Sequence, residues 1–363
     1  MKRSSALQSP DGRLQVPYSE VTHACLTPSI HALLQYLLLF DYDTVTRHTA
    51  YFTGYAVSHD IASHLPGHWF PVEQTGIHPS AHRMLQKVGI RLTRRCRYPY
   101  LSHARLFAFD LGFVPPLIGR CPYALLSDGP LGISQNMQTS SAEYQRQISR
   151  SHTLQGHLEQ ILFGPTAVFG WGNNAQCREF YMTEENHCDI FHNKPVHVQS
   201  LHALWKQAGI PQREFVKHVF NIDRHDIDLL NSRRVMFCTQ PIVRDGILTT
   251  TEYLTLLKSI FAHYDTSQLL LKLHPRDDFD YRKYFPDVAV YDKKVNMQLL
   301  VLLGADVERA ATICSSSVNS FPENVEVDWY GTSIHPKLKA WFGEAVPPYR
   351  KHNLVSIDPA TLG

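Results

Sequence analysis

The sequence has no excess of charge of either sign. Its 35 lysines and arginines are balanced by 33 aspartates and glutamates, which leaves a formal net charge of +2 at pH 7. Proteins that bind nucleic acid through electrostatics carry a strongly basic domain or patch. The near-neutral balance therefore excludes a typical basic nucleic-acid-binding domain, and we expect no nucleic acid among the partners.

Long hydrophobic runs are absent as well. The longest early run, Leu37-Leu38-Leu39-Phe40, is far shorter than the ~20 apolar residues that span a bilayer. The seven cysteines are odd in number and widely scattered. This pattern excludes a disulfide scaffold and is typical of a reduced, intracellular protein. We therefore expect a soluble chain without a transmembrane segment.

Three common ligand motifs are also missing. No Gly-x-Gly-x-x-Gly follows a predicted strand and no Walker lysine loop occurs, so NAD and P-loop functions have no support. No Cys-x-x-Cys pair accompanies the 21 histidines, so a zinc protein is not implied. Asp-x-Asp strings at 41–43, 226–228 and 278–280 could suggest a divalent cation, but they lie in polar segments. We predict no metal site and no cofactor.

The chain has enough apolar residues for a large core, because 44% of its 363 residues are hydrophobic. At about 150 residues per domain, this length favours two domains. A polar stretch containing Asp223-Arg224-His225-Asp226 separates two patterned halves. We expect one domain over residues 1–225 and a second over residues 226–363.

The second half alternates between strand and helix patterns. The apolar run 235–238 predicts a buried strand. Thr249-x-x-Glu252 then forms a capping box, and apolar residues at 253, 256, 257, 260 and 261 predict an amphipathic helix. We predict further strands at 269–273, 288–291, 311–314 and 325–330, and a helix at 296–303. Such alternation predicts a parallel, doubly wound α/β sheet.

The first half has a weaker pattern of the same kind. A helical leucine stripe at 33, 34, 37 and 38 follows Thr27-Pro28-Ser29. The segments 51–57, 106–109, 123–126 and 166–169 resemble strands. We therefore predict an α/β fold for this half too.

Polar residues follow three predicted strands of the second half. They are Gln240, His274 with Pro275, and Ser315-Ser316-Ser317. Ligands of open parallel sheets bind at the carboxyl ends of strands. Proline biases His274 towards an extended conformation, and the serines are expected to open a helix whose amides and dipole attract an anion. Each feature has an ordinary alternative, such as a capping histidine or a serine N-cap, but together they predict a phosphate site.

The first half contributes Ser127-Asp128-Gly129, directly after the predicted strand 123–126. A carboxylate at a strand end can act as a general base, and the glycine allows a substrate to approach closely. The alternative is a plain Asp-Gly turn.

In this order and spacing, Asp-Gly, Thr-Gln-Pro, Lys-x-His-Pro-Arg and the serine cluster resemble the bacterial sialyltransferases of glycosyltransferase family 52 and the related capsular polysialyltransferases. That group has D/E-D/E-G, HP and S or SS/T motifs. The resemblance covers residues 234–320 and extends to residues 123–129. It implies a GT-B fold, in which two Rossmann-like domains face a central cleft, the first binding the acceptor and the second the nucleotide sugar.

The resemblance also implies a reaction and residue roles. The expected enzyme is an inverting, metal-independent glycosyltransferase that moves sialic acid from CMP-sialic acid to lipooligosaccharide or capsule. Asp128 would deprotonate the acceptor and His274 would assist departure of CMP. The donor would be bound by Gln240, Pro275, Ser315, Ser316 and Ser317. A cytoplasmic location is expected, with peripheral association at the inner face of the bacterial membrane as the alternative.

One position departs from the family pattern, because Ser127 stands where the group usually has its first acid. A donor-hydrolysing or inactive relative therefore remains an alternative. So do other transferases with a His-Pro motif, which use CMP-Kdo or CDP-glycerol, and a non-catalytic GT-B binding protein. The sequence does not indicate the acceptor, the linkage, single transfer against polymerisation, or the oligomeric state.

Overall fold

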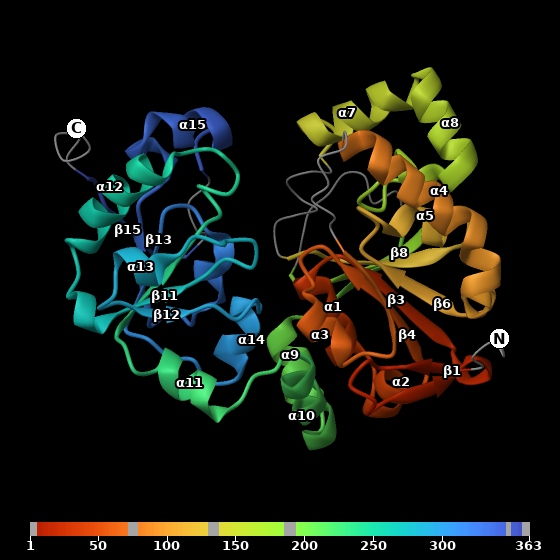
Figure 1. Cartoon of the computed structure of the whole chain (residues 1–363), viewed down its shortest axis with the longest axis horizontal. Helices are drawn as coiled ribbons and strands as arrows, with labels where there is room; N and C mark the ends of the chain where they lie inside the picture. Colours follow the sequence, from red (N-terminus) through yellow and green to blue (C-terminus); the bar gives the residue numbers. More distant parts are fainter. Residues whose placement is uncertain (1–5, 72–78, 130–137, 185–193, 346–349, 358–363) are drawn as a thin grey trace. The chain divides into compact units, whose positions relative to one another are not determined.

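The computed structural model describes residues 6–71, 79–129, 138–184, 194–345 and 350–357. The chain divides into two compact units, Met1–Asn221 and Ile222–Gly363, each built around its own sheet (Figure 1). This division lies four residues before the boundary expected after residue 225. Within the described segments, no helix is both long and apolar enough to cross a bilayer.

The first unit contains a seven-stranded, all-parallel sheet in the order β5-β4-β3-β6-β7-β8-β9. Its first strand is central, and later strands are added on both sides, as in a doubly wound fold. The strands are β3 His23–Thr27, β4 Thr49–Gly54, β5 Gly67–Phe70, β6 Arg105–Ala108, β7 Tyr123–Leu126, β8 Cys177–Met182 and β9 Val196–Val198.

The helices of the first unit connect these strands and extend beyond the last one. They are α1 Ile30–Leu39, α2 Tyr42–Arg47, α3 His59–Ser63, α4 Pro79–Arg97, α5 Val114–Ile118, α7 Ala142–Ser151, α8 Leu154–Phe163, α9 Leu201–Gln207 and α10 Ile210–Val219. A short antiparallel hairpin, β1 Ala6–Gln8 and β2 Gln15–Pro17, precedes β3.

Alternate residues of the strands pack on opposite faces of the first sheet. On one face, Tyr36 of α1 makes edge contacts with Tyr51 of β4 and Phe107 of β6. The neighbouring residues Phe52 and Leu106 belong to a buried cluster that also contains residues of α4 and α5. Helices therefore cover both faces, which explains why several strands are apolar throughout.

The second unit repeats this plan with six parallel strands in the order β12-β11-β10-β13-β14-β15. The predicted parallel α/β class is confirmed for both halves. The strands are β10 Val235–Cys238, β11 Leu269–Lys272, β12 Ala289–Tyr291, β13 Arg309–Thr312, β14 Glu326–Trp329 and β15 Asn353–Leu354. The helices are α11 Arg224–Leu230, α12 Thr250–Phe261, α13 Tyr281–Tyr284, α14 Met297–Leu302 and α15 Pro336–Phe342.

Helix α12 forms as its sequence predicts. Thr249 and Glu252 make the reciprocal capping box, with Thr249 accepting from the Glu252 amide and Glu252 accepting from the Thr249 amide. The apolar stripe is almost completely buried against the sheet. Its members are Tyr253, Leu256, Leu257, Ile260 and Phe261.

Three predicted strands are wrong in type or position. The strand predicted at 51–57 is β4, which begins two residues earlier and ends three residues earlier, at Gly54. Residues 166–169 do not form a strand, because Gly164 adopts a positive φ and the 3-10 turn Pro165–Ala167 follows it. The strand predicted at 311–314 is β13, two residues earlier. Its pairing with β10 ends at Thr312, because the Thr312 hydroxyl donates to the Cys238 carbonyl oxygen and accepts from the Ser315 amide.

Candidate active site

The carboxyl ends of β11, β10 and β13 are adjacent in the second sheet and in register. Cys238, the last residue of β10, pairs with Lys272 on one side and Thr312 on the other. The chain leaves the sheet at this edge through Gln240, His274 and Ser315. The edge lies at the point where strand order reverses, between β10 and β13, which is where ligands bind in doubly wound sheets.

The His-Pro turn after β11 is held by hydrogen bonds. The His274 amide donates to the Thr239 hydroxyl at 3.0 Å, and that hydroxyl donates to Asp277 Oδ2 at 2.6 Å. Tyr281 of α13 donates to the same carboxylate oxygen at 2.8 Å. Because Thr239 and Asp277 are buried, this network fixes the backbone of the turn.

The environment of His274 defines its protonation. The amide of Arg276 donates to His274 Nδ1 at 3.1 Å, so Nδ1 accepts and the proton of the neutral ring is on Nε2. Burial, together with the charges of Arg276 and Lys272, lowers the His274 pKa to about 4. The ring is therefore a neutral hydrogen-bond donor at pH 7. A histidine that binds phosphate can also be a positively charged imidazolium, but His274 is not in that form.

The serine cluster differs from the expected helix start. Ser316–Ser320 is a 3-10 helix of five residues, so the predicted dipole of a longer α-helix is wrong. The hydroxyls of Ser315 and Ser317 lie 2.7 Å apart and form a hydrogen bond, while Ser316 is exposed. Two hydroxyls held together, and a third that solvent reaches, still form a polar group at the end of β13.

Gln240 lies half-buried at the start of a loop that packs on the His-Pro turn. Farther along this loop, Arg244 donates to the Arg276 carbonyl oxygen at 2.8 Å, and Asp245 forms an ion pair with the Arg276 guanidinium at 3.1 Å. Asp245 is followed by Gly246, so an Asp-Gly pair other than Asp128-Gly129 lies beside the His-Pro turn. Sequence reasoning missed it, although the letters alone could have revealed it.

Lys272 is a second residue that sequence reasoning left unassigned. It is 5% exposed, and its Nζ donates to the Leu273 carbonyl oxygen at 2.7 Å. Among the described residues no carboxylate forms an ion pair with it. Burial lowers its pKa to about 8. Its partner in the sheet, Cys238, interacts with Ser317, which places the amine and the serine cluster around the same thiol.

Asp128 is at the end of β7 in the first unit, where it accepts a hydrogen bond from the Ser29 hydroxyl. Asp128 is exposed as a residue, yet the protein around its carboxyl group still weakens the hydration of that group. This desolvation raises the Asp128 pKa to about 6, and the bond from Ser29 partly opposes it. Gly129 has φ +115°, a left-handed backbone conformation that favours glycine.

Ser127 has a structural role at the position where the family usually has an acid. It is 1% exposed, and its amide and hydroxyl donate to Gln35 Oε1 of α1 at 3.1 and 3.3 Å. Ser127 therefore ties the end of β7 to α1 through the side chain of Gln35.

Of the predicted site residues, Asp128 lies in the first unit, and Gln240, His274, Pro275 and Ser315–Ser317 lie at one edge of the second sheet. In the part of the chain that the structure describes, one group of at least three potential metal ligands occurs. It consists of Asp11, His64 and His218 and belongs to the first unit, whereas the His-Pro turn belongs to the second.

Comparison with solved structures supports the fold. A 2,6-sialyltransferase from Photobacterium sp. JT-ISH-224, in a ternary complex with CMP and lactose, matches with a TM-score of 0.53, 12% identity, and coverage of 87% of this chain and 75% of that chain. The GT-B domain of a Photobacterium damselae sialyltransferase matches with a TM-score of 0.50, 14% identity, and coverage of 86% and 92%. The predicted GT-B fold is thereby confirmed.

Comparison of sequences identifies the family. An uncharacterized protein of Haemophilus influenzae (strain Rd) is 31% identical over 245 residues, which are 67% of this chain and 70% of the relative. The model of glycosyltransferase family 52 matches residues 116–338, a span that includes Asp128, the His-Pro turn and the serine cluster. This chain belongs to glycosyltransferase family 52.

Proposed function

We propose that this chain is an inverting, metal-independent sialyltransferase that moves sialic acid from CMP-sialic acid to a glycan acceptor. The observation that carries the proposal is the His274 ring, a neutral Nε2–H donor at the same sheet edge as the Ser315 and Ser317 hydroxyls. CMP is the leaving group of such a reaction, and the 2,6-sialyltransferase that shares the fold binds CMP.

His274 assists the departure of CMP. As the bond from the sugar carbon to the phosphate oxygen breaks, negative charge develops on that oxygen. The Nε2–H of His274 donates to it, and the Arg276 amide keeps the ring in the required tautomer. A fixed donor of this kind is effective because it needs no reorganisation during the reaction.

The remaining phosphate oxygens bind to groups at the ends of β11 and β13. One of Ser315 and Ser317 donates to the other, so this pair offers one hydroxyl donor, and Ser316 is open to solvent and can turn towards a ligand. Lys272 supplies positive charge from within the sheet, where a bound phosphate would act as a counter-ion for this buried ammonium.

Asp128 acts as the general base. Its raised pKa, about 6, makes the carboxylate more basic than an ordinary aspartate and yet ionised at pH 7, which is the range that suits proton transfer near neutrality. It takes the proton of the acceptor hydroxyl while that oxygen bonds to the sugar carbon, opposite the departing CMP. The acceptors proposed are terminal sugars of lipooligosaccharide or capsule.

The test is a donor screen followed by product analysis. CMP-sialic acid, CMP-Kdo and CDP-glycerol are compared by thermal shift, because a ligand at 100 times its Kd stabilises by about 2.7 kcal/mol. Turnover is then measured with lactose as a model acceptor. We expect CMP-sialic acid to stabilise and to yield a sialylated product. Stabilisation by CMP-Kdo or CDP-glycerol alone would overturn the donor assignment, and binding without turnover would make this a non-catalytic member.

The base is tested by comparing Asp128→Asn with Asp245→Asn. Both changes remove a carboxylate that precedes a glycine, one in each unit. We expect Asp128→Asn to lose transfer, while donor binding persists, and Asp245→Asn to lose only the ion pair with Arg276. If transfer is lost in Asp245→Asn and kept in Asp128→Asn, the base lies beside the His-Pro turn and the role of Asp128 is wrong.

A further inference from the structure

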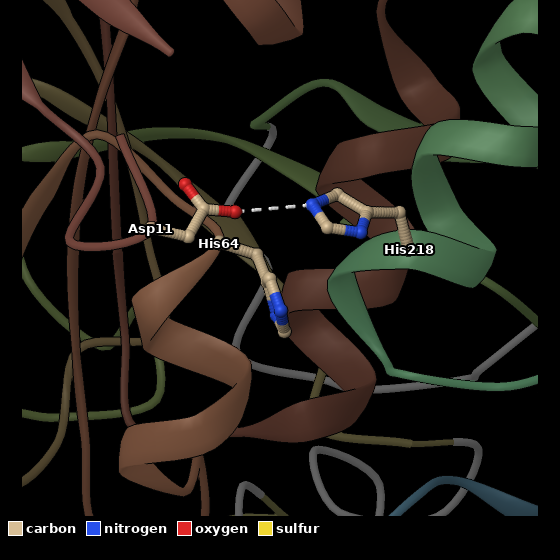
Figure 2. A group of neighbouring side chains, drawn as sticks. All are labelled: Asp11, His64 and His218. Atoms are coloured by element: carbon tan, nitrogen blue, oxygen red, sulfur yellow. Dashed lines mark hydrogen bonds and ion pairs between the residues drawn. The ribbon is translucent and has the colours of Figure 1, made fainter. Parts of the chain in front are cut away.

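Three segments of the first unit bring metal-ligating side chains together. Asp11 lies in the loop of the β1–β2 hairpin, His64 follows the end of α3, and His218 is in the last turn of α10 (Figure 2). Each offers one ligand atom, and these atoms all lie within 4.8 Å of one another. The group is at the other edge of the sheet from Asp128, because His64 is three residues before β5 begins while Asp128 follows the end of β7.

The cluster is partly preorganised by hydrogen bonds. Asp11 Oδ2 and His218 Nε2 are 3.2 Å apart, and Ser9 donates to the other oxygen of Asp11 at 2.5 Å. His64 Nδ1 donates to the Val219 carbonyl oxygen at 3.3 Å. Because a carbonyl can only accept, Nδ1 of His64 is protonated and Nε2 has the free electron pair that a metal needs. A backbone carbonyl that holds the second ring nitrogen is common for metal-binding histidines.

The protonation of the cluster also suits a cation. Hydrogen bonds from Ser9, the Arg13 amide and His218 outweigh the effect of burial and lower the pKa of Asp11. Burial and the adjacent His64 lower the pKa of His218. Both shifts are in the direction of the forms that bind metals, a carboxylate and a neutral imidazole.

We propose that Asp11, His64 and His218 form a Zn²⁺ site that joins the N-terminal hairpin to α3 and α10. Two imidazoles and one carboxylate form a set that zinc accepts, at ligand distances of about 2.0–2.2 Å. Ligands around one ion are then about 3.3–3.5 Å apart. The Asp11–His218 pair, at 3.2 Å, already has nearly that spacing, and His64 has to approach these two ligands from a distance of up to 4.8 Å.

The site would have a structural effect that the transfer reaction does not need. Asp11 and His218 are 207 residues apart and lie near the two ends of the first unit. A hairpin of two three-residue strands is only marginally stable by itself. A metal that ties it to α3 and α10 would hold the two ends of the unit together.

Arg13 is the local competitor of the ion. Its Nη1 is 3.3 Å from His218 Nδ1, and its Nε is 3.9 Å from Asp11 Oδ2. Zinc at His218 Nε2 requires the proton on Nδ1, which then faces the Arg13 donor. The Arg13 side chain is 69% exposed and can move into solvent. Replacing Arg13 by alanine removes a positive charge and a competing hydrogen-bond donor. Arg13→Ala should therefore bind zinc more tightly than wild type.

The experiment titrates the full chain, without an affinity tag, with ZnCl₂ and follows heat and melting temperature. We expect one equivalent to bind and raise the melting temperature. His64→Ala, His218→Gln and Asp11→Asn should each weaken binding by on the order of tenfold or more, since even second-shell losses cost 10–100-fold. His157→Ala, which removes an exposed histidine of the same unit, should bind like wild type.

Two results would overturn the site. The first is zinc binding that is equal in wild type, His157→Ala and all three ligand variants, which would mean adventitious binding by other histidines. The second is binding that Arg13→Ala weakens. Circular dichroism confirms that each variant folds. The zinc titration tests only the metal site, and the donor screen tests only sialyl transfer. A negative result in one experiment therefore leaves the other proposal unaffected.

Discussion

Ser29 links the start of α1 to Asp128, which lies 99 residues later in the chain. Its hydroxyl donates to Asp128 Oδ1 and accepts from the Ala32 amide at 3.2 Å, so one side chain caps the helix and contacts the proposed base. The bond to Asp128 favours the ionised carboxyl, whereas desolvation disfavours it and raises the pKa to about 6. The acidity of Asp128 is therefore set partly by a helix cap.

Replacing Ser29 by alanine should change both activity and stability. Without its donor, Asp128 should have a still higher pKa, so the acidic limb of the pH profile of kcat/KM should move to higher pH. The lost cap should cost about 1 kcal/mol of unfolding free energy. Ser58→Ala is the matched control, because Ser58 caps α3 in the same way. It should lose stability with no change in the pH profile. An unmoved limb in Ser29→Ala would contradict the coupling.

Asp128→Asn should be more stable than wild type at high pH. The folded pKa of about 6 is above the ordinary value of 3.8, so the folded state binds more protons between these values. This contribution to stability is full below pH 3.8 and is lost as the pH rises through 6. Urea unfolding should therefore show that Asp128→Asn raises the unfolding free energy, relative to wild type, by more at pH 8 than at pH 4. Equal effects at both pH values would mean that desolvation does not control this carboxyl.

Local sequence predicts much of the second unit because local interactions determine it. The run 235–238 and the Thr249–Glu252 capping box each specify their element without distant partners. The end of β13 is different. Ile313 and Cys314 continue the apolar pattern, but the strand stops at Thr312 because its hydroxyl turns the chain by accepting from the Ser315 amide. A strand end that depends on such a contact is not visible in the apolar pattern.

The contacts that define the sites come mostly from residues far apart in the chain. Gln35 and Ser127 are separated by 92 residues, and their hydrogen bonds give the serine at this position a structural role that the sequence does not reveal. The group of Asp11, His64 and His218 has no characteristic spacing, so the sequence predicted no metal site. In contrast, His274 and the serines were identifiable because each directly follows an apolar run that predicts a strand.

Lys272→Met should fold at least as well as wild type and bind CMP more weakly. The change removes a buried amine whose pKa is lowered to about 8 by desolvation, so stability should not fall. If Lys272 supplies charge to the phosphate, wild-type affinity for CMP should also decrease as the pH rises above 8, and Lys272→Met should lack this decrease. Calorimetric titration at pH 7 and 9 measures both effects. Unchanged affinity at pH 7 would show that the amine only fills the sheet.

His274→Ala should retain its fold and lose transfer by on the order of 100-fold or more, the usual cost of removing a preorganised donor. His225→Ala, which changes an exposed histidine of the same unit, should keep wild-type activity.

The stability of a second variant, His274→Gln, gives an independent check. The folded pKa of His274 is about 4 against an ordinary 6.5, so the unfolded chain binds more protons in that window. The contribution of the neutral ring is full above pH 6.5 and is lost as the pH falls towards 4. Between pH 7 and 5, His274→Gln should therefore lose less unfolding free energy than wild type, while His225→Ala follows wild type. If His274→Gln loses as much unfolding free energy as wild type, the ring is protonated in the folded protein. Departure of CMP would then be assisted by a cation and not by a neutral donor.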